Sequence, residues 1–219
     1  MSKKGIDRNS ATLTHQVTEI LRREIVHGER EAGARLSEVA IAAAYDVSRG
    51  PVREAIQRLA RDGLVVVEPH RGAFVQRLGR QDVEELFEVR IALECEAAAL
   101  AAVKMTAEGL EQLRRMQQQS ASALSEQGNG FPDDVDLHGL IAMLSASPRL
   151  SALVEQINTE LRLARSRSGS TAVRAAIALA EHDELIEHLA AQDPEQAALA
   201  MRRHLSGALA NTLVLMYAP

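Results

Sequence analysis

Four polar residues spaced four positions apart give one N-terminal segment a face that could read DNA. They are Arg49, Arg53, Gln57 and Arg61. On a helix, this spacing forms one stripe opposite the apolar residues Val52, Ala55, Ile56 and Leu59. An arginine near the start of such a helix can donate two hydrogen bonds to O6 and N7 of guanine in the major groove. Arg49 is the first candidate for this contact, and Arg53 is the second.

Residues on either side of this stripe are suited to the DNA backbone and the minor groove. Ser48 precedes the predicted helix, whose first N–H groups lack helical partners and favour a phosphate. Further along the chain, His70, Arg71 and Gly72 form the tip of a predicted hairpin. The glycine allows a close backbone approach, and the negative potential of the minor groove attracts arginine. The alternative is that these residues form an ordinary solvated surface.

Four residues in the C-terminal half could hold a metal ion. Asp134 and His138 are four positions apart on one predicted helix, so their side chains project from the same face. His182 and His204 lie on two further predicted helices, and antiparallel packing would bring them toward one point. Neutral imidazoles with one carboxylate suit Zn, Ni, Mn or Fe and leave positions open for water or a ligand. Spacing alone leaves open that these histidines, among seven in the chain, are surface or core residues.

The elements that must position the arginine stripe are three helices and a hairpin. Helical periodicity and cap residues predict helices over 11–27, 37–45 and 49–62. Two β-branched runs, joined by a turn that contains glycine, predict strands over 64–67 and 73–76. Three helices followed by a β-wing form a winged helix-turn-helix.

Helices alone must position the candidate metal ligands, because strand signals vanish after a connector at 78–81. Six segments have helical periodicity, at about 82–103, 107–127, 133–146, 149–168, 171–191 and 194–216. The clearest start is at Asp193, which can cap a helix whose first residue is Pro194. We therefore expect a mainly α protein, with a winged helix-turn-helix over 1–77 followed by an antiparallel helical bundle over 82–219.

Composition limits the class of protein further. The chain is 46% apolar and 25% charged, which is typical of a globular protein, and the 2% aromatic content favours an aliphatic, helical core. The single cysteine, Cys95, cannot form an internal disulfide and is expected to be buried. The sequence has neither an apolar run of membrane-helix length nor the apolar stretch of a signal peptide, which predicts a cytoplasmic protein.

Charge is divided unevenly along the chain. The net charge is −5, but residues 1–77 are net positive and the remaining residues are net negative. This division is expected if only the N-terminal end must approach phosphates.

A long motif crosses the second and third predicted helices and the wing. It comprises Leu-Ser-Glu-Val-Ala at 36–40, Val-Ser-Arg-Gly-Pro-Val-Arg-Glu-Ala at 47–55 and Arg-Gly-Ala-Phe-Val at 71–75. With its surroundings, from about Leu13 to Val75, it resembles the DNA-binding domain of the GntR family of bacterial regulators. Gly50 is an expected contact position that departs from the family pattern, in which Thr is common, so one hydroxyl contact is lost. The resemblance implies that a homodimer binds a short palindromic operator in double-stranded DNA.

Three C-terminal segments carry a second resemblance. They read Asp-Val-Asp-Leu-His at 134–138, Glu-His-Asp-Glu-Leu-Ile at 181–186 and Met-Arg-Arg-His-Leu at 201–205. They are similar to the metal-ligand segments of the FCD sensor domain of the FadR-like branch, with Leu137 in place of a common Phe. The resemblance implies that a divalent transition metal, Zn before Ni, Mn or Fe, is bound by Asp134, His138, His182 and His204.

A third segment, Val-Arg-Ile-Ala-Leu-Glu at 89–94, resembles the opening helix of the same domain. Members of this branch typically sense small organic acids, and a guanidinium suits a carboxylate ligand. The resemblance implies that Arg90 contacts the effector, with Arg162 and Arg165 as further candidates. A surface ion pair is the alternative for all three arginines.

These observations predict a transcription regulator, more often a repressor in this family. Its operator affinity would be controlled by a small carboxylate effector bound at a metal-containing helical domain. One alternative is a small metallohydrolase that uses the aspartate and the three histidines, but it leaves residues 11–77 unexplained. Another is a fatty-acyl-type sensor without a metal.

Overall fold

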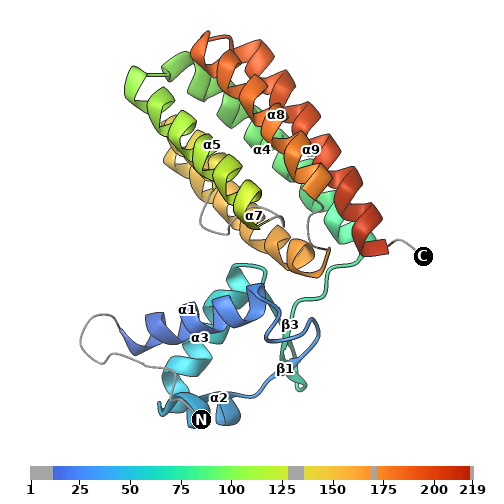
Figure 1. Cartoon of the computed structure of the whole chain (residues 1–219). Helices are drawn as coiled ribbons and strands as arrows, with labels where there is room; N and C mark the ends of the chain where they lie inside the picture. Colours follow the sequence, from blue (N-terminus) through green and yellow to red (C-terminus); the bar gives the residue numbers. More distant parts are fainter. Residues whose placement is uncertain (1–11, 128–135, 169–171, 218–219) are drawn as a thin grey trace. The chain divides into compact units, whose positions relative to one another are not determined.

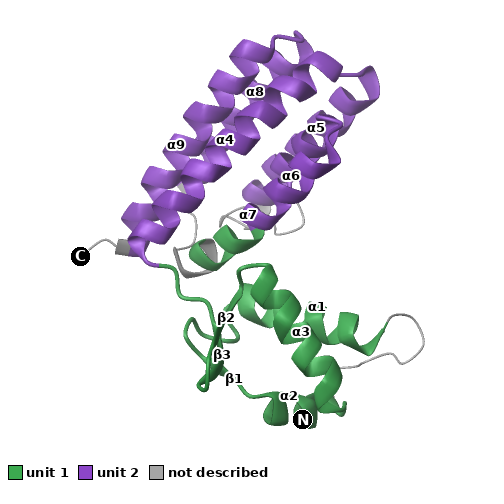
Figure 2. Ribbon diagram, turned by 180° about the vertical axis from the view of Figure 1, so that it is seen from behind, with its two compact units in different colours: residues 1–78, 159–167 green, residues 79–158, 168–219 purple. Residues whose placement is uncertain are grey.

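The computed structural model describes residues 12–127, 136–168 and 172–217, which form two compact units. The first unit comprises residues 1–78 and 159–167, and the second comprises residues 79–158 and 168–219 (Figure 2). Helices dominate and the strands are confined to the first unit in the described part of the chain, so the predicted mainly α fold is confirmed (Figure 1). The division into domains 1–77 and 82–219 with a linker at 78–81 stays a prediction.

The N-terminal part of the first unit is a winged helix-turn-helix. Its helices are α1 (Leu13–Val26), α2 (Glu38–Tyr45) and α3 (Arg49–Arg61), and its strands are β1 (Arg35–Leu36), β2 (Val65–Glu68) and β3 (Gly72–Val75). The strands form one antiparallel sheet in the order β1-β3-β2. The predicted helices and hairpin are confirmed, whereas β1 was not predicted because two residues are too few for an alternating pattern.

A small aliphatic core fixes the orientation of α3. Val17 and Leu21 of α1 and Val52 and Leu59 of α3 are fully buried, and these two helices pack against each other. Since the apolar side of α3 points inward, its polar side must point outward.

Local caps and turns set the angle at which α3 follows α2. Ser37 Oγ accepts a hydrogen bond from the Ala40 N–H at 3.3 Å and so caps α2. Asp46 has a φ of 53°, in the left-handed region that short polar side chains tolerate. This sharp turn ends α2 and lets α3 begin three residues later.

A buried carboxylate ties α1 to α2. The Tyr45 hydroxyl donates to Glu24 Oε2 at 2.7 Å, and Arg30 Nε donates to the same oxygen at 2.6 Å. Burial, together with the Glu24 charge, raises the pKa of Tyr45 to about 12. The tyrosine is therefore a neutral donor at physiological pH.

Replacing Glu24 with alanine is expected to lower the free energy of unfolding by about 3 kcal/mol, because a buried hydroxyl and a half-buried guanidinium lose their acceptor. Urea denaturation followed by circular dichroism measures this loss. Val39→Ala is the control, since Val39 is 61% exposed on α2 and its truncation should change stability by less than about 0.5 kcal/mol. Equal stability of the two variants would contradict a structural role for Glu24.

The second unit is a bundle of five long helices and the short helix α6 in the described part of the chain. They are α4 (Arg80–Lys104), α5 (Ala107–Gln127), α6 (Leu137–Leu144), α7 (Pro148–Ser168), α8 (Ala172–Ala190) and α9 (Pro194–Tyr217), with part of α7 assigned to the first unit. Figure 1 shows α4, α8 and α9 side by side, and α4 also packs on α6. The buried face of α4 is rich in alanine, including Ala97, Ala98, Ala101 and Ala102. These small side chains allow neighbouring helices to approach closely.

Side-chain caps explain where the helix ends differ from the expected ones. α4 begins at Arg80 rather than at 82, because Asp82 reaches back to accept from the Gly79 N–H at 2.7 Å. α6 begins after Asp136, which accepts from the Gly139 N–H at 2.9 Å, and residues 133–135 lie outside the described part. The predicted cap of α9 is confirmed, since Asp193 Oδ1 accepts from the Gln196 N–H at 3.0 Å.

Cys95 lies in the core of the second unit with 6% of its surface exposed. Burial raises the pKa of its thiol. The expected buried thiol is thus confirmed.

Among the helices of the described residues, none combines the length and apolar character that crossing a bilayer requires.

Candidate DNA-binding surface and metal centre

The candidate DNA-binding surface is the outward side of α3. Arg49 and Arg53 expose 61% and 62% of their side chains, and Gln57 and Arg61 are also exposed. The apolar residues on the opposite side of α3 are buried. The structure therefore places the predicted stripe where a groove could receive it, and its contact with DNA stays a prediction.

Ser48 and Gly50 lie at the start of α3. Ser48 is the N-cap residue, but its side chain makes no capping hydrogen bond to the helix. A Cβ added to Gly50 would meet only Ser48 Oγ, at 4.0 Å. There is room for the threonine that is common at position 50, so the lost hydroxyl contact has no steric cause.

The sequence-based prediction missed Glu38, an acid that both candidate base-reading arginines approach. Nε and Nη2 of Arg53 donate to the two carboxylate oxygens of Glu38, each at 2.9 Å. Nη2 of Arg49 lies 3.7 Å from Glu38 Oε2. The hydrogen bond from Arg53 lowers the pKa of Glu38, so this pair is charged at neutral pH. In the sequence, Glu38 stood out only as an acidic residue in the first turn of a predicted helix.

The wing tip brings together His70 and Arg71 of the turn after β2 with Gly72, the first residue of β3. His70 and Gly72 have φ angles of 62° and 109°, and at 109° only glycine is free of steric strain. Arg71 is exposed, pairs with Glu68 and lies 5.8 Å from the centroid of the Phe74 ring. The wing arginine, like Arg53, thus has an acidic partner on the same surface.

The candidate metal centre is formed by three histidines from three helices. His138 of α6, His182 of α8 and His204 of α9 each offer a ring nitrogen, and these nitrogens lie within 4.8 Å of one another. Nε2 of His182 is 3.3 Å from Nε2 of His204. The His138 ring centroid is 5.4 Å from that of His182 and 5.1 Å from that of His204. Three of the four predicted ligands are therefore brought together, and Asp134 lies outside the described residues.

Two carboxylates lie behind these histidines. His138 Nδ1 is 2.5 Å from Glu94 Oε2, and His204 Nδ1 is 2.7 Å from Glu181 Oε2. A ring nitrogen that donates its proton to a carboxylate leaves the other nitrogen with a lone pair for a metal. Arg174 in turn donates to Glu181 at 2.8 and 3.1 Å. Neither glutamate was predicted, although Glu181 directly precedes His182 in sequence.

The electrostatic setting keeps His182 and His204 neutral and Glu181 charged. Burial and the neighbouring His138 lower the pKa of His182 well below its usual value, and burial is also the main cause that lowers the pKa of His204 to about 4. Burial alone would raise the pKa of Glu181, but the bonds from His204 and Arg174 lower it to about 2. At neutral pH, both histidines are thus in the unprotonated form that a metal requires.

The donor set fits a divalent transition metal. Three buried or half-buried imidazoles, two of them oriented by carboxylates, are typical ligands of Zn, Ni or Fe. The positions and the chemistry of the three histidine side chains are therefore both suited to a metal ion.

Arg90 belongs to the same buried network. Its side chain is only 4% exposed, its Nε donates to Glu94 Oε1 at 2.7 Å, and its guanidinium carbon lies 5.5 Å from the Phe87 ring centroid. Arg90 and His138 pull the pKa of Glu94 well below its usual range, against the effect of burial. The alternative of a surface ion pair is therefore wrong for Arg90. Its remaining N–H donors on Nη1 and Nη2 are of the kind that binds carboxylates.

The other two predicted effector residues lie on α7. Arg162 is half-buried, and the side chain of Arg165 lies outside the described part.

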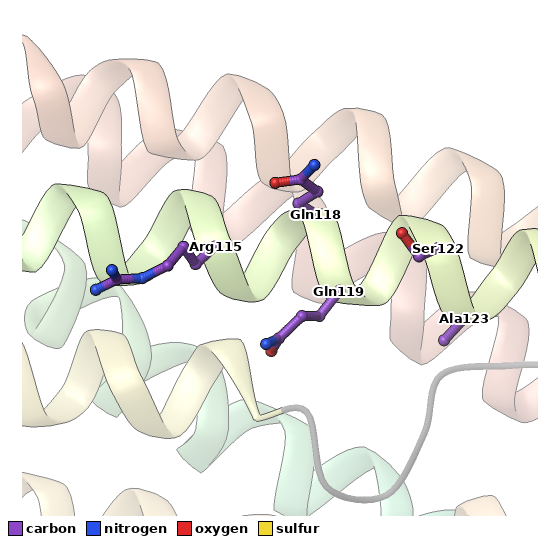
Figure 3. Close-up of a pocket in the computed structure, with 5 residues that line it drawn as sticks. All are labelled: Arg115, Gln118, Gln119, Ser122 and Ala123. Atoms are coloured by element: carbon purple, nitrogen blue, oxygen red, sulfur yellow. The ribbon is translucent and has the colours of Figure 1, made fainter.

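A separate pocket follows α5 and is lined by Arg115, Gln118, Gln119, Ser122 and Ala123 (Figure 3). Its lining contains no predicted site residue and is mostly exposed, unlike a typical small-molecule site, which buries most of its ligand.

Comparison with known families places both parts of the chain. Residues 13–75 match the model described as bacterial regulatory proteins, gntR family, and residues 85–207 match the FCD domain model. The chain belongs to the GntR family and carries an FCD domain. The two resemblances inferred from the sequence motifs are therefore confirmed.

Similar proteins include HTH-type transcriptional regulators that match this chain along most of their length. The HTH-type transcriptional repressor RspR of Escherichia coli K12 is 29% identical over 195 residues, which are 88% of this chain and 86% of RspR. The HTH-type regulator YdhC of Bacillus subtilis 168 is 28% identical over 192 residues, 85% of this chain and 84% of YdhC.

Solved structures of transcription regulators share this fold. A GntR regulator from Rhodococcus sp. RHA1 aligns with a TM-score of 0.74 at 30% identity, covering 93% of this chain and 98% of that one. The McbR/YncC structure from E. coli aligns with a TM-score of 0.76, covering 93% of this chain and 98% of that one, and at 22% identity it supports the fold alone. This GntR protein is thus a DNA-binding transcription regulator rather than an enzyme, and the metallohydrolase interpretation is not supported.

Proposed function

We propose that this GntR regulator is a cytoplasmic, homodimeric repressor whose operator affinity is set by a small organic acid bound at a metal-containing FCD domain. The observation that carries the proposal is the buried network in which Glu94 joins Arg90 to His138, one of three convergent histidines. A guanidinium beside a metal site suits a carboxylate ligand. The description of the similar protein RspR as a transcriptional repressor supports the direction of regulation.

On the DNA side, α3 is proposed to enter the major groove. Arg49 and Arg53 contact guanine, with Gln57 further along the same exposed stripe. Ser48 and the backbone at Gly50 contact phosphate at the start of the helix. The wing residues His70, Arg71 and Gly72 reach the neighbouring minor groove.

On the sensor side, His138, His182 and His204 are proposed to hold the metal, with Asp134 as a fourth ligand. Zinc is the first choice among the metals that this donor set suits. When bound, the metal would supply a Lewis acid, which suits a carboxylate effector. Glu94 and Glu181 orient the histidines, while Arg90 donates to the effector from Nη1 and Nη2. Arg162 and Arg165 are further proposed effector contacts.

A dimer converts a small change at the sensor into a large change in DNA affinity. Two recognition helices must meet two half-sites of a palindrome at the same time, so their separation matters. An effector that favours a different separation lowers operator affinity by its differential affinity for the two states.

The first test is a selection of genomic fragments at one fixed salt concentration. Wild-type protein is expected to enrich a short palindrome, and Arg49→Ala to lower its affinity for that palindrome about tenfold or more through loss of a guanine contact. Fluorescence anisotropy with the selected duplex measures the loss. Arg115→Ala is the matched control, because Arg115 is equally exposed but lies on α5 of the second unit. A wild-type protein that enriched no sequence would refute operator recognition.

The control mechanism is tested by titrating the complex of metal-loaded protein and selected duplex with a panel of small mono-, di- and hydroxycarboxylates. Release of the duplex at constant salt is expected for one class of acid. A carboxylate that bound the protein tightly while leaving duplex affinity unchanged would refute effector control.

A further inference from the structure

The carboxylate of Glu38 holds one edge of the guanidinium that the proposed function assigns to base reading. Nε and Nη2 of Arg53 bind its two oxygens side-on, each at 2.9 Å. Glu38 is the first residue of α2, whose start is fixed by the Ser37 cap. The carboxylate is therefore anchored on one helix and holds a side chain of the next.

The side-on geometry leaves a defined set of donors on Arg53. The guanidinium has five N–H groups in a rigid fork, of which Glu38 takes Nε–H and one on Nη2. The edge formed by Nη1 and Nη2 keeps the paired donors that match O6 and N7 of guanine. Because the side chain of Arg53 is 62% exposed, it would otherwise sample many rotamers before binding.

Other roles explain Glu38 less well. The side chain of Arg53 is 62% exposed and that of Glu38 is 27% exposed, and ion pairs in such contact with solvent contribute little to folding, so stability does not explain the pair. An acid on a surface that approaches phosphates opposes general DNA affinity. Glu38 also lies 3.7 Å from Nη2 of Arg49, so it contacts both candidate base-reading arginines.

We propose that Glu38 is a positioning residue for sequence specificity, which presents the Nη edge of Arg53 to guanine at the expense of general DNA affinity. This proposal rests on the proposed function of α3 in base reading. Glu38 acts only through Arg53 and Arg49 and makes no contact with DNA itself.

The test compares two probes, a duplex selected by the wild-type protein and a scrambled duplex of the same length and composition. In the full-length protein, Glu38→Gln is expected to lower the ratio of the two affinities about tenfold, while affinity for the scrambled duplex stays equal or rises. Glu31→Gln removes an exposed acid of the same unit and is expected to leave the ratio unchanged. Thermal unfolding checks that both variants are folded.

Two further variants separate geometry from charge and stability. Glu38→Asp keeps the charge but shortens the reach, so it is expected to lower the ratio as well, and it replaces Glu38→Gln if the latter fails to fold. Adding Glu38→Gln to Arg53→Ala is expected to change the ratio no further than Arg53→Ala alone. A purely structural role for Glu38 would make the two changes additive and would weaken binding to both duplexes equally.

The outcomes distinguish this proposal from the proposed function. If Arg49→Ala and Arg53→Ala bind the selected duplex as wild type does, α3 does not read bases and both proposals fail. If these variants lose the selected duplex but Glu38→Gln keeps the wild-type ratio, α3 reads bases and the role assigned to Glu38 is refuted.

Discussion

Replacing His182 with alanine is expected to lower the affinity of the protein for Zn²⁺ by about a hundredfold or more, because one of three convergent imidazoles is lost from a buried site. Competition with a chromogenic chelator, using protein purified without a histidine tag, measures the change. His188→Ala is the matched control. His188 lies on the same helix, six positions away, with 27% of its side chain exposed and Glu184 at 3.7 Å.

Metal removal gives a second measurement for the same site. A ligand present at a hundred times its Kd stabilises the folded state by about 2.7 kcal/mol. A chelator is therefore expected to lower the Tm of Zn²⁺-loaded wild-type protein and of His188→Ala, but to leave the Tm of His182→Ala unchanged. Wild-type protein without stoichiometric metal, or equal affinity in both variants, would refute the metal centre and favour the metal-free sensor.

Replacing Glu94 with glutamine is expected to lower Zn²⁺ affinity about 10- to 100-fold, although Glu94 is not a proposed ligand. The carboxylate accepts from Nδ1 of His138 at 2.5 Å and from Nε of Arg90 at 2.7 Å. Glutamine keeps the shape but loses the charge, which weakens the hold on His138 and leaves the Arg90 cation unpaired beside the metal. Chelator competition measures affinity, and nitrogen NMR of the His138 ring reports which nitrogen carries the proton.

Two comparisons keep this result interpretable. Glu84→Gln removes an exposed acid from the same helix, where it pairs with Arg80, and should leave Zn²⁺ affinity unchanged. Glu94→Gln should also lower the free energy of unfolding, because it leaves the buried Arg90 cation unpaired. Adding Arg90→Met removes that charge and should recover part of this loss without recovering the orientation of His138. Metal affinity in Glu94→Gln equal to that in Glu84→Gln would contradict the assigned orientation.

Most elements of the fold could be predicted because their signals are local. Apolar periodicity located α3, and the Asp193-Pro194 pair located the start of α9, since capping involves residues only a few positions apart. β1 escaped prediction because its pairing with β3 joins Arg35 to Phe74 and Leu36 to Ala73, and nothing in two residues signals a distant partner.

The three clustered histidines of the candidate site could be singled out from the sequence, but the carboxylates that bond to two of them could not. Spacing and family resemblance singled out His138, His182 and His204. Glu94 was missed because it meets His138 across 44 positions of sequence, and helical periodicity assigns a residue to a face without naming its neighbour. Glu38 was missed for the same reason, since its bonds to Arg53 connect two helices.

The buried thiol of Cys95 gives this protein a practical advantage for spectroscopy. Its low exposure and raised pKa suppress reaction with maleimides, which require an accessible thiolate. No other cysteine occurs in the chain. A cysteine introduced at Val67, which is 45% exposed on β2, would therefore take up a label selectively. In the proposed homodimer, two such labels would report the distance between the wings directly, with and without DNA, Zn²⁺ or a candidate acid.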